Sequence, residues 1–226
     1  MQPPLHLLER ALGYKFNDRG LLQQAVTHRS YGMPHYERLE FLGDSMLNCV
    51  VAAQLFSRFP ALREGDLSRL RANLVRQDTL HRVADGLKLG DYLMLGEGEL
   101  KSGGHRRPSI LADAFEAALG AIFLDRGFSA VEEVIVRLYT ELFETIDPGN
   151  TGKDPKTLLQ ELLQGRHMSL PVYTLLSTHG EAHAQKFQVE CSLSDLKLRT
   201  TGIGNSRRAA EQEAAHAAIA LIPKKP

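Results

Sequence analysis

The spacing of apolar residues changes once along this chain, and that change limits the possible folds more than any other feature. From about residue 4 to residue 143, apolar side chains recur every three or four positions, which is the period of an α-helix packed on one side. The clearest examples are Ser45–Phe59, Leu67–Leu87, Ile110–Phe123 and Val131–Phe143. Farther along the chain the pattern alternates, so that Phe187, Val189 and Cys191 share one face of an expected strand. The sequence therefore predicts a multidomain protein, with an all-α domain followed by a small α+β domain.

A run of turn-forming residues separates the two patterns. Residues 147–152 read Asp-Pro-Gly-Asn-Thr-Gly, which favours a linker. We place the all-α domain at residues 1–146, the linker at 147–153 and the second domain at 154–226. These lengths are ordinary for two domains in 226 residues.

The second domain is expected to have the order α-β-β-β-α. Asp154 is placed to cap a first helix that has Pro155 in its first position, and Ser206 is placed to cap a last helix ending near residue 221. Strands are expected at residues 172–178, 185–193 and 196–201, and the glycines of residues 202–204 are expected to end the third strand. In the first domain, glycine-rich residues 96–108 are expected to form a loop.

Composition excludes several classes of protein. The cysteines, Cys49 and Cys191, have neither disulfide-scaffold nor zinc-site spacing. No apolar run approaches the ~18–20 residues needed to cross a bilayer, and no secretory signal is visible, so we expect a cytoplasmic protein without a membrane contact. The formal net charge is zero, but residues 153–226 hold 10 Lys/Arg against 7 Asp/Glu, which is a weak indication of a polyanion-binding second domain.

Two pairs of carboxylates stand on helices that are otherwise apolar. Glu40 and Asp44 are four residues apart, and Asp113 and Glu116 are three apart, so each pair shares a helix face. Desolvated like charges repel unless a cation or proton compensates them. Four such oxygen ligands suit Mg²⁺ or Mn²⁺ and phosphodiester hydrolysis. Either pair taken alone is as well explained by a solvent-facing helix surface.

The residues around these pairs resemble a known family. The segment Glu37-Arg38-Leu39-Glu40-Phe41-Leu42-Gly43-Asp44-Ser45 is similar, nearly residue for residue, to the signature of bacterial ribonuclease III, and residues 28–31 and 96–117 fit the same family in order. One departure is Tyr36, where the family usually has asparagine. The resemblance covers essentially the whole chain. It implies a homodimeric endonuclease that cuts double-stranded RNA, leaves 5′-phosphate and 3′-hydroxyl ends, and processes ribosomal RNA precursors, messenger RNA, transfer RNA and other structured transcripts.

The resemblance also implies roles for individual acidic residues. Glu40, Asp113 and Glu116 would be Mg²⁺ ligands, with Mn²⁺ able to substitute, and Asp44 and Glu116 would be the catalytic residues. Glu37 and Glu64 would have supporting roles near the scissile phosphate and the dimer interface.

The dimer is expected to form through the signature helix. Phe41, Leu42 and Met46 offer more apolar surface than a metal site requires, and Gly43 would let another backbone approach closely. An ordinary core helix would have the same composition, so the sequence leaves both interpretations open.

Residues 154–222 resemble a double-stranded RNA-binding domain, which recognises A-form shape through 2′-hydroxyl and phosphate contacts. Carried over by position, the RNA-binding residues would be Thr157, Gln160, Glu161, His183, Ser206, Arg207 and Arg208. The two arginines also have a physical argument of their own. Cations in the first turn of a helix oppose its dipole, and a converging phosphate would compensate them.

Two other functions remain open at this stage. A dimer that grips double-stranded RNA without cutting would use the same second domain, but all four acidic residues are present. A helical phosphohydrolase for small substrates would use the same acidic residues, but it would not need an RNA-binding domain.

Overall fold

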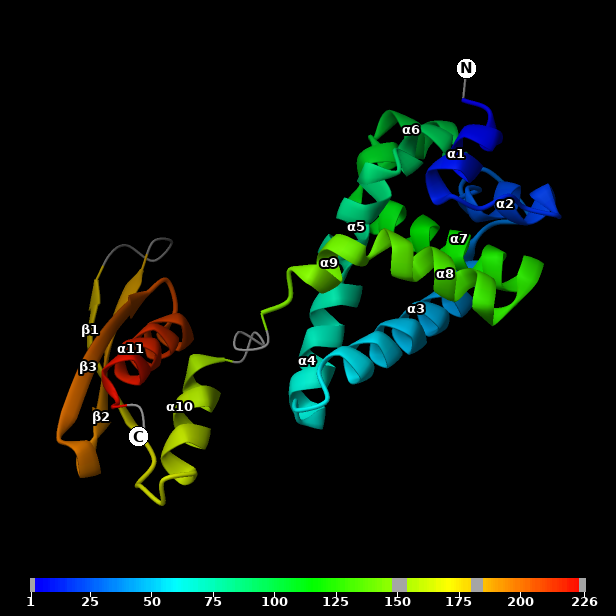
Figure 1. Cartoon of the computed structure of the whole chain (residues 1–226). Coiled ribbons are helices and arrows are strands. Elements are labelled where there is room, and N and C mark those ends of the chain that lie inside the picture. Colours follow the sequence, from blue (N-terminus) through cyan, green and yellow to red (C-terminus); the bar gives the residue numbers. More distant parts are fainter. Residues whose placement is uncertain (1–2, 148–153, 180–184, 224–226) are drawn as a thin grey trace. The chain divides into compact units, whose positions relative to one another are not determined.

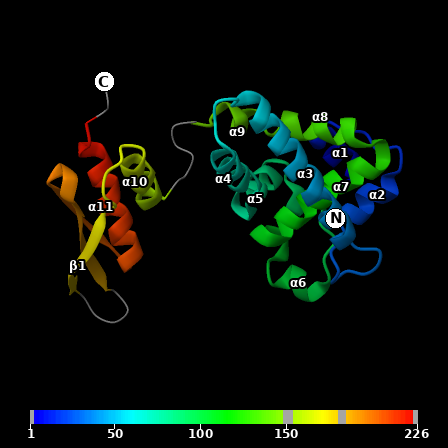
Figure 2. The ribbon, with the colours of Figure 1, turned by 90° about the horizontal axis from the view of Figure 1, so that it is seen from below.

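The computed structural model describes residues 3–147, 154–179 and 185–223 of the chain. The chain divides into two compact units, residues 1–151 and 152–226, and each is described by itself (Figures 1 and 2). The first unit is built from helices, and the second combines a three-stranded antiparallel sheet with two longer helices. The predicted fold class is therefore confirmed.

Nine α-helices form the described part of the first unit. They are α1 (Leu5–Leu12), α2 (Arg19–Ala25), α3 (Glu37–Arg58), α4 (Glu64–Val75), α5 (Gln77–Gly86), α6 (Glu97–Lys101), α7 (Pro108–Arg126), α8 (Phe128–Leu138) and α9 (Thr140–Glu144). Short 3₁₀ turns cover Leu89–Tyr92 and Gly104–Arg106.

Two expectations for this unit need correction. The stretch Leu67–Leu87 is two helices, because Arg76 has an extended backbone (φ −69°, ψ 152°) that ends α4 and begins α5. Residues 96–108 are not a simple loop, since they contain α6 and a 3₁₀ turn. In the first place one extended residue interrupts a continuous apolar period, and in the second a glycine-rich segment still forms short helical turns.

Helix α7 is the centre of the first unit. Its residues from Ile110 to Ile122 are buried except Asp113 and Glu116, which are half-buried. It packs against α2, α3, α5 and α8, which explains why it is apolar around almost its whole circumference. The two acidic residues therefore project from the most enclosed helix of the unit.

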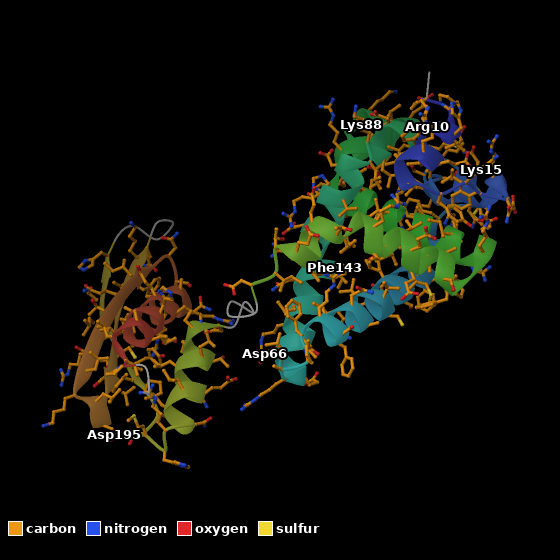
Figure 3. All side chains as sticks on the ribbon, viewed as in Figure 1. Arg10, Lys15, Asp66, Lys88, Phe143 and Asp195 are labelled. Carbon is orange, nitrogen blue, oxygen red and sulfur yellow. The ribbon has the colours of Figure 1, made fainter. Side chains whose placement is uncertain are left out.

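The second unit has the predicted order, α10 (Pro155–Gln164), β1 (Val172–His179), β2 (Lys186–Leu193), β3 (Leu198–Gly204) and α11 (Arg207–Leu221). The strands pair antiparallel in the order β1-β2-β3. Its core joins Leu159 and Leu163 of α10, Cys191 and Leu193 of β2, and the alanine face of α11. Figure 3 draws the side chains of the described residues as sticks on the ribbon of each unit.

Both predicted caps are present in the second unit. The backbone N–H of Lys156 donates to Asp154 Oδ1 (2.9 Å), and the N–H of Ala209 donates to Ser206 Oγ (3.1 Å). The third strand, however, does not stop at Gly202, which pairs with Val189 of β2. A Cβ atom on Gly202 would lie 2.3 Å from the carbonyl oxygen of Ala210, so glycine is needed there to let α11 lie against β3.

Candidate functional site

Helices α3 and α7 cross with their backbones in contact, and two glycines make this possible. A Cβ atom on Gly43 would lie 1.7 Å from the carbonyl oxygen of Glu116. A Cβ atom on Gly120 would lie 2.1 Å from the carbonyl oxygen of Leu39. The close approach predicted for Gly43 is therefore used inside the chain, against α7, and is not available to a second copy of the protein.

This crossing brings the two acidic pairs together. Ligand oxygens of Glu40, Asp113 and Glu116 all lie within 4.8 Å of one another, and the three residues are half-buried. Asp44 follows Glu40 by one helical turn on α3, and its charge adds to the effect of burial in raising the pKa of Glu116. Its Oδ1 accepts a hydrogen bond from Asn48 Nδ2 (2.8 Å). Three of the four carboxylates, drawn from both helices, therefore have oxygens close enough to share one ion, whereas Asp44 is exposed one turn along α3 from Glu40.

The electrostatics of this acidic cluster, Glu40, Asp44, Asp113 and Glu116, favour a compensating cation. Burial, followed by the charges of the neighbouring acidic residues, raises the pKa of Glu40 to about 7 and that of Glu116 to about 8. Burial also raises the pKa of Asp113, with a contribution from Glu37. In the part of the chain that the structure describes, no ion pair joins Glu40, Asp113 or Glu116 to a basic side chain. Three oxygen donors with raised pKa values and no basic partner fit a hard divalent ion.

A polar cavity of about 570 Å³ opens beside the acidic cluster. Glu40 and Asp113 form part of its wall, and Glu37, Arg29 and Arg107 stand around it. Glu37 is half-exposed and is paired with Arg29 (Nη1 to Oε1, 3.3 Å). Arg107 is paired with Glu99 (2.6 Å). Sequence patterns did not single out Arg29 as a site residue, although it lies in a segment that fits the family.

Tyr36 replaces the usual asparagine without loosening the start of α3. Its side chain is buried, and its ring meets the edge of the His28 ring with the centroids 5.7 Å apart. Its N–H donates to the carbonyl oxygen of Thr27 (3.0 Å), and its own carbonyl accepts from the N–H groups of Leu39 and Glu40. Tyr36 therefore anchors the turn that presents Glu37 and Glu40.

Glu64 lies in a different environment from the acidic cluster. It begins α4, where its Oε1 accepts a hydrogen bond from Ser68 Oγ (2.7 Å). It lines a mainly apolar groove of about 690 Å³ together with Leu62, Leu67 and Phe56. Within one chain, then, Glu37 stands beside the acidic cluster, whereas Glu64 stands on the groove between α3 and α4.

The exposed face of α3 carries two phenylalanines, Phe41 and Phe56, whose side chains are 77% and 75% exposed. Leu42 and Met46, by contrast, are half-buried, and Met46 packs against the core of its own chain. Of the three residues expected to supply a dimer surface, only Phe41 is freely exposed. Phe56 was not expected from the sequence, although 15 residues are about 4.2 helical turns, which leaves Phe41 and Phe56 on roughly the same side of α3.

In the second unit, the predicted RNA-binding residues gather on α10 and at the start of α11. Thr157, Gln160 and Glu161 are exposed on α10. Ser206 caps α11, and the Arg207 and Arg208 that follow it are exposed. The predicted residue His183 lies outside the described residues. Asp154 and Glu211, which contact the arginines, were not predicted as site residues.

Comparison with known proteins agrees with both halves of this description. Residues 18–142 match the Ribonuclease-III-like family model, and residues 155–222 match the double-stranded RNA binding motif. The chain is 62% identical over 224 residues to a protein of Aromatoleum aromaticum named Ribonuclease 3, covering 99% of this chain and 100% of that one. It is 63% identical over 217 residues to the Ribonuclease 3 of Thiobacillus denitrificans, covering 96% of each.

The fold of the first unit also has a solved counterpart. The nuclease domain of the Campylobacter jejuni ribonuclease III is 44% identical, with a TM-score of 0.60, and the match covers 63% of this chain and 98% of that one. The acidic site on two helices, the match to an RNA-binding motif and the relatives that match over nearly the whole chain all indicate the same family. The chain belongs to the ribonuclease III family and is an endoribonuclease of double-stranded RNA.

Proposed function

We propose that Glu40, Asp113 and Glu116 hold Mg²⁺, which Mn²⁺ can replace, for the hydrolysis of phosphodiester bonds in double-stranded RNA. The observation that carries this proposal is the distance of at most 4.8 Å among their ligand oxygens at a half-buried site. When bound, the cation would lower the pKa of a water molecule and offset the charge that develops on the scissile phosphate. The products would carry a 5′-phosphate and a 3′-hydroxyl.

The chain's own residues have separate tasks in this proposal. Asp44, fixed by its hydrogen bond from Asn48, orients the attacking water beside Glu116. Glu37 and its partner Arg29 line the cavity, where Arg29 would meet the backbone of the RNA near the scissile phosphate. Glu64 supports the dimer interface from the groove that it lines.

The first prediction concerns the metal. Protein stripped with EDTA should leave long duplex RNA intact, and added Mg²⁺ or Mn²⁺ should restore cleavage. Binding of the cation to the folded state should also raise the unfolding temperature, because a ligand that binds only the folded state stabilises it. Duplex cleavage at the full rate in excess EDTA would exclude the proposed cofactor.

The same experiment has a definite pH dependence. The folded protein holds protons on Glu40 and Glu116 up to about pH 7 and 8, whereas in the unfolded chain these groups titrate near 4.5. Without metal, the folded state therefore binds more protons across this window, and its stability should fall as the pH rises from about 5 to 8. Mg²⁺ binds the deprotonated groups, so it should stabilise the protein more at pH 8 than at pH 5.5. The double variant E40Q/E116Q should lose both trends; retention of both would assign them to other groups.

For substrate recognition, we propose that the second unit binds the duplex through the two helices that carry its predicted contacts. Thr157, Gln160 and Glu161 would reach 2′-hydroxyls and base edges, and the segment containing His183 would enter a minor groove. Arg207 and Arg208 would bind phosphates at the start of α11, which Ser206 caps.

The cellular role that we propose is the processing of ribosomal RNA precursors and other structured transcripts in the cytoplasm. One helix of the described chain, α3, is long and apolar enough to span a membrane by length and composition. Its backbone contact with α7 and its three acidic side chains instead suit a helix of a globular domain.

We propose that the protein acts as a homodimer through the exposed face of α3. Phe41 projects from the start of this helix, and the apolar groove lined by Phe56, Leu62 and Leu67 lies at its other end. A two-fold related copy would place each Phe41 against the opposite groove, which makes a self-complementary contact. A solved Campylobacter jejuni nuclease domain, 43% identical with a TM-score of 0.61, is described as having flexibility in a region involved in dimer formation.

The second prediction tests this dimer. Phe41→Asp should shift the protein from dimer to monomer in sedimentation velocity, because it places a charge at an apolar contact. Leu124→Asp, on the exposed side of α7, makes the same kind of change on another helix and should leave a dimer. A dimer of unchanged stability for F41D would exclude this face.

A further inference from the structure

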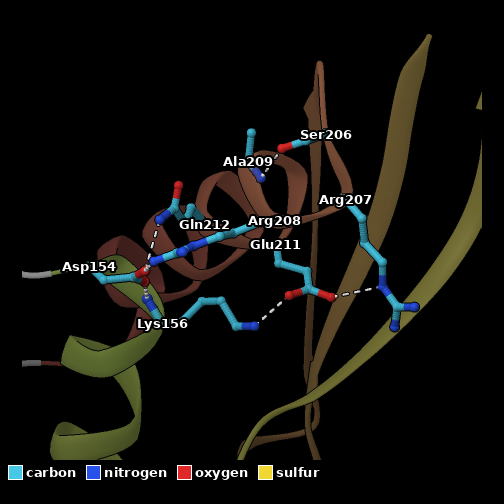
Figure 4. Close-up of polar contacts among 8 residues, drawn as sticks. All are labelled: Asp154, Lys156, Ser206, Arg207, Arg208, Ala209, Glu211 and Gln212. Atoms are coloured by element: carbon cyan, nitrogen blue, oxygen red, sulfur yellow. Dashed lines mark hydrogen bonds and ion pairs between the residues drawn. The ribbon is translucent and has the colours of Figure 1, made fainter.

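The first turns of α10 and α11 are joined by two carboxylates (Figure 4). Asp154 caps α10 through Lys156, and its Oδ2 accepts hydrogen bonds from two side chains of α11, Gln212 Nε2 (2.8 Å) and Arg208 Nη2 (3.4 Å). One carboxylate group therefore holds the beginning of one helix and two side chains of the other.

The second carboxylate makes an equivalent bridge. Glu211 of α11 accepts from Lys156 Nζ of α10 and, through Oε1, from Arg207 Nε (3.0 Å). The hydrogen bond from Lys156 is the main cause that lowers the pKa of Glu211, and Arg207 adds to it. Burial raises the pKa of Asp154, but the hydrogen bonds from Gln212, the Lys156 N–H and Arg208 outweigh it and lower the pKa. The carboxyl groups of Glu211 and Asp154 are therefore both ionised at neutral pH.

The two carboxylates are more buried than the arginines that they contact. The side chains of Arg207 and Arg208 are 61% and 79% exposed, whereas those of Glu211 and Asp154 are 13% and 26% exposed. An incoming phosphate would therefore meet the guanidinium groups before it met the acidic groups.

The hydrogen bond between Arg207 and Glu211 uses Nε and not the two terminal nitrogens of the guanidinium group. Arg207 donates to Glu211 through Nε, and in Figure 4 its two terminal nitrogens point away from the carboxylate. Those nitrogens form part of the fork that binds a phosphate with two parallel hydrogen bonds. A long side chain held in this way loses less conformational freedom when it binds.

We propose that Glu211 and Asp154 are positioning residues for RNA binding: they hold Arg207 and Arg208 at the surface and join α10 and α11 into one preorganised phosphate-binding face. This inference rests on the proposed RNA-binding role of Arg207 and Arg208. It predicts that removing either carboxylate changes the RNA affinity in the direction opposite to that expected from charge repulsion alone. Removing a negative charge beside a polyanion site should strengthen binding if long-range attraction dominates, but should weaken it if positioning dominates.

The third prediction concerns whether removing a carboxylate weakens or strengthens RNA binding. The affinity of the full-length protein for a duplex RNA is measured by fluorescence anisotropy at about 0.15 M salt, in EDTA to prevent cleavage. Glu211→Ala, in a helix already rich in alanine, should weaken binding about three- to tenfold. Glu213→Ala removes the same charge from the same helix, where the carboxylate contacts the backbone N–H of Ile203, and should bind equally or slightly more tightly.

A second variant guards against a folding defect. Asp154→Asn keeps the ability to cap α10 but removes the charge that holds Arg208, so it should fold normally and bind two- to fivefold more weakly, as estimated for one released side chain. Thermal unfolding of each variant checks that the second unit is intact. In the double variant R207A/E211A the loss of binding should be smaller than the sum of the two single losses, because part of the effect of Glu211 acts through Arg207.

The outcomes separate the two levels of the proposal. If R207A weakens binding while both E211A and D154N bind as tightly as the unaltered protein or more tightly, the positioning role is wrong and the RNA-binding face stands. If R207A itself binds normally, then Arg207 does not contact RNA and both proposals for this residue fail. Weaker binding by E213A equal to that of E211A would make the effect a general loss of helix contacts and would also overturn the inference.

Discussion

Replacing Glu116 by glutamine should lower the rate of duplex RNA cleavage by roughly 10³-fold while leaving duplex binding within about twofold of the unaltered protein. Burial and three neighbouring acidic charges raise the pKa of Glu116 to about 8, above the value of about 7 for Glu40. Glutamine keeps the shape but cannot offer an anionic oxygen to a cation. Binding should persist because most of the proposed RNA contacts lie in the second unit, and Arg29 of the first unit is unchanged in this variant.

The measurement is a single-turnover cleavage assay in Mg²⁺ together with a gel-shift assay in EDTA. The matched control is Glu133→Gln, an exposed acidic position on α8, which should cleave at the normal rate. Cleavage by E116Q within a few-fold of normal would remove Glu116 from the site. Loss of RNA binding by E116Q would indicate instead that the substitution disturbs the fold.

Replacing Gly43 by alanine should destabilise the first unit by about 3 kcal/mol or more and abolish cleavage. The added Cβ would stand 1.7 Å from the carbonyl oxygen of Glu116, a backbone atom that cannot rotate aside. Alanine's better helix propensity returns only about 1 kcal/mol, so the steric term decides the sign. Relief requires α3 and α7 to separate, which would move Glu40 away from Asp113 and Glu116.

Chemical denaturation measures the stability change, and Gly86→Ala is the control. Gly86 is also helical, in α5, but a Cβ there would have nothing within 4 Å. That substitution should be neutral or should stabilise the protein by less than about 1 kcal/mol. An unchanged denaturation midpoint for G43A would mean that the two helices do not cross as closely as described.

The sequence predicted the fold class well, because periodicity and capping are local properties. The change from helical to alternating spacing marks the two units, and Asp154 and Ser206 cap the helices assigned to them. The acidic pairs were recognisable because carboxylates are out of place on apolar helices. Their convergence was a hypothesis from the residues and an expectation from the family resemblance, since spacing within one helix carries no information about the crossing of two.

Other features could not be predicted because they depend on contacts between distant segments. Gly43 was linked to a second copy of the chain, but its partner is Gly120 and its neighbours on α7. Gly202 was expected to end β3, yet its missing side chain serves the packing of α11. In each case a glycine marks a close approach, and the sequence alone does not reveal what approaches.

The position of Asp154 has a practical consequence for protein engineering. This residue caps α10 and also accepts hydrogen bonds from two side chains on α11, so the residue immediately before Pro155 is part of the surface proposed to bind RNA. A fusion that transplants this module onto another enzyme should therefore begin upstream of Asp154. A fusion that starts at Pro155 would keep the hydrophobic core of the module but lose Asp154, one of the two carboxylates that position its arginines.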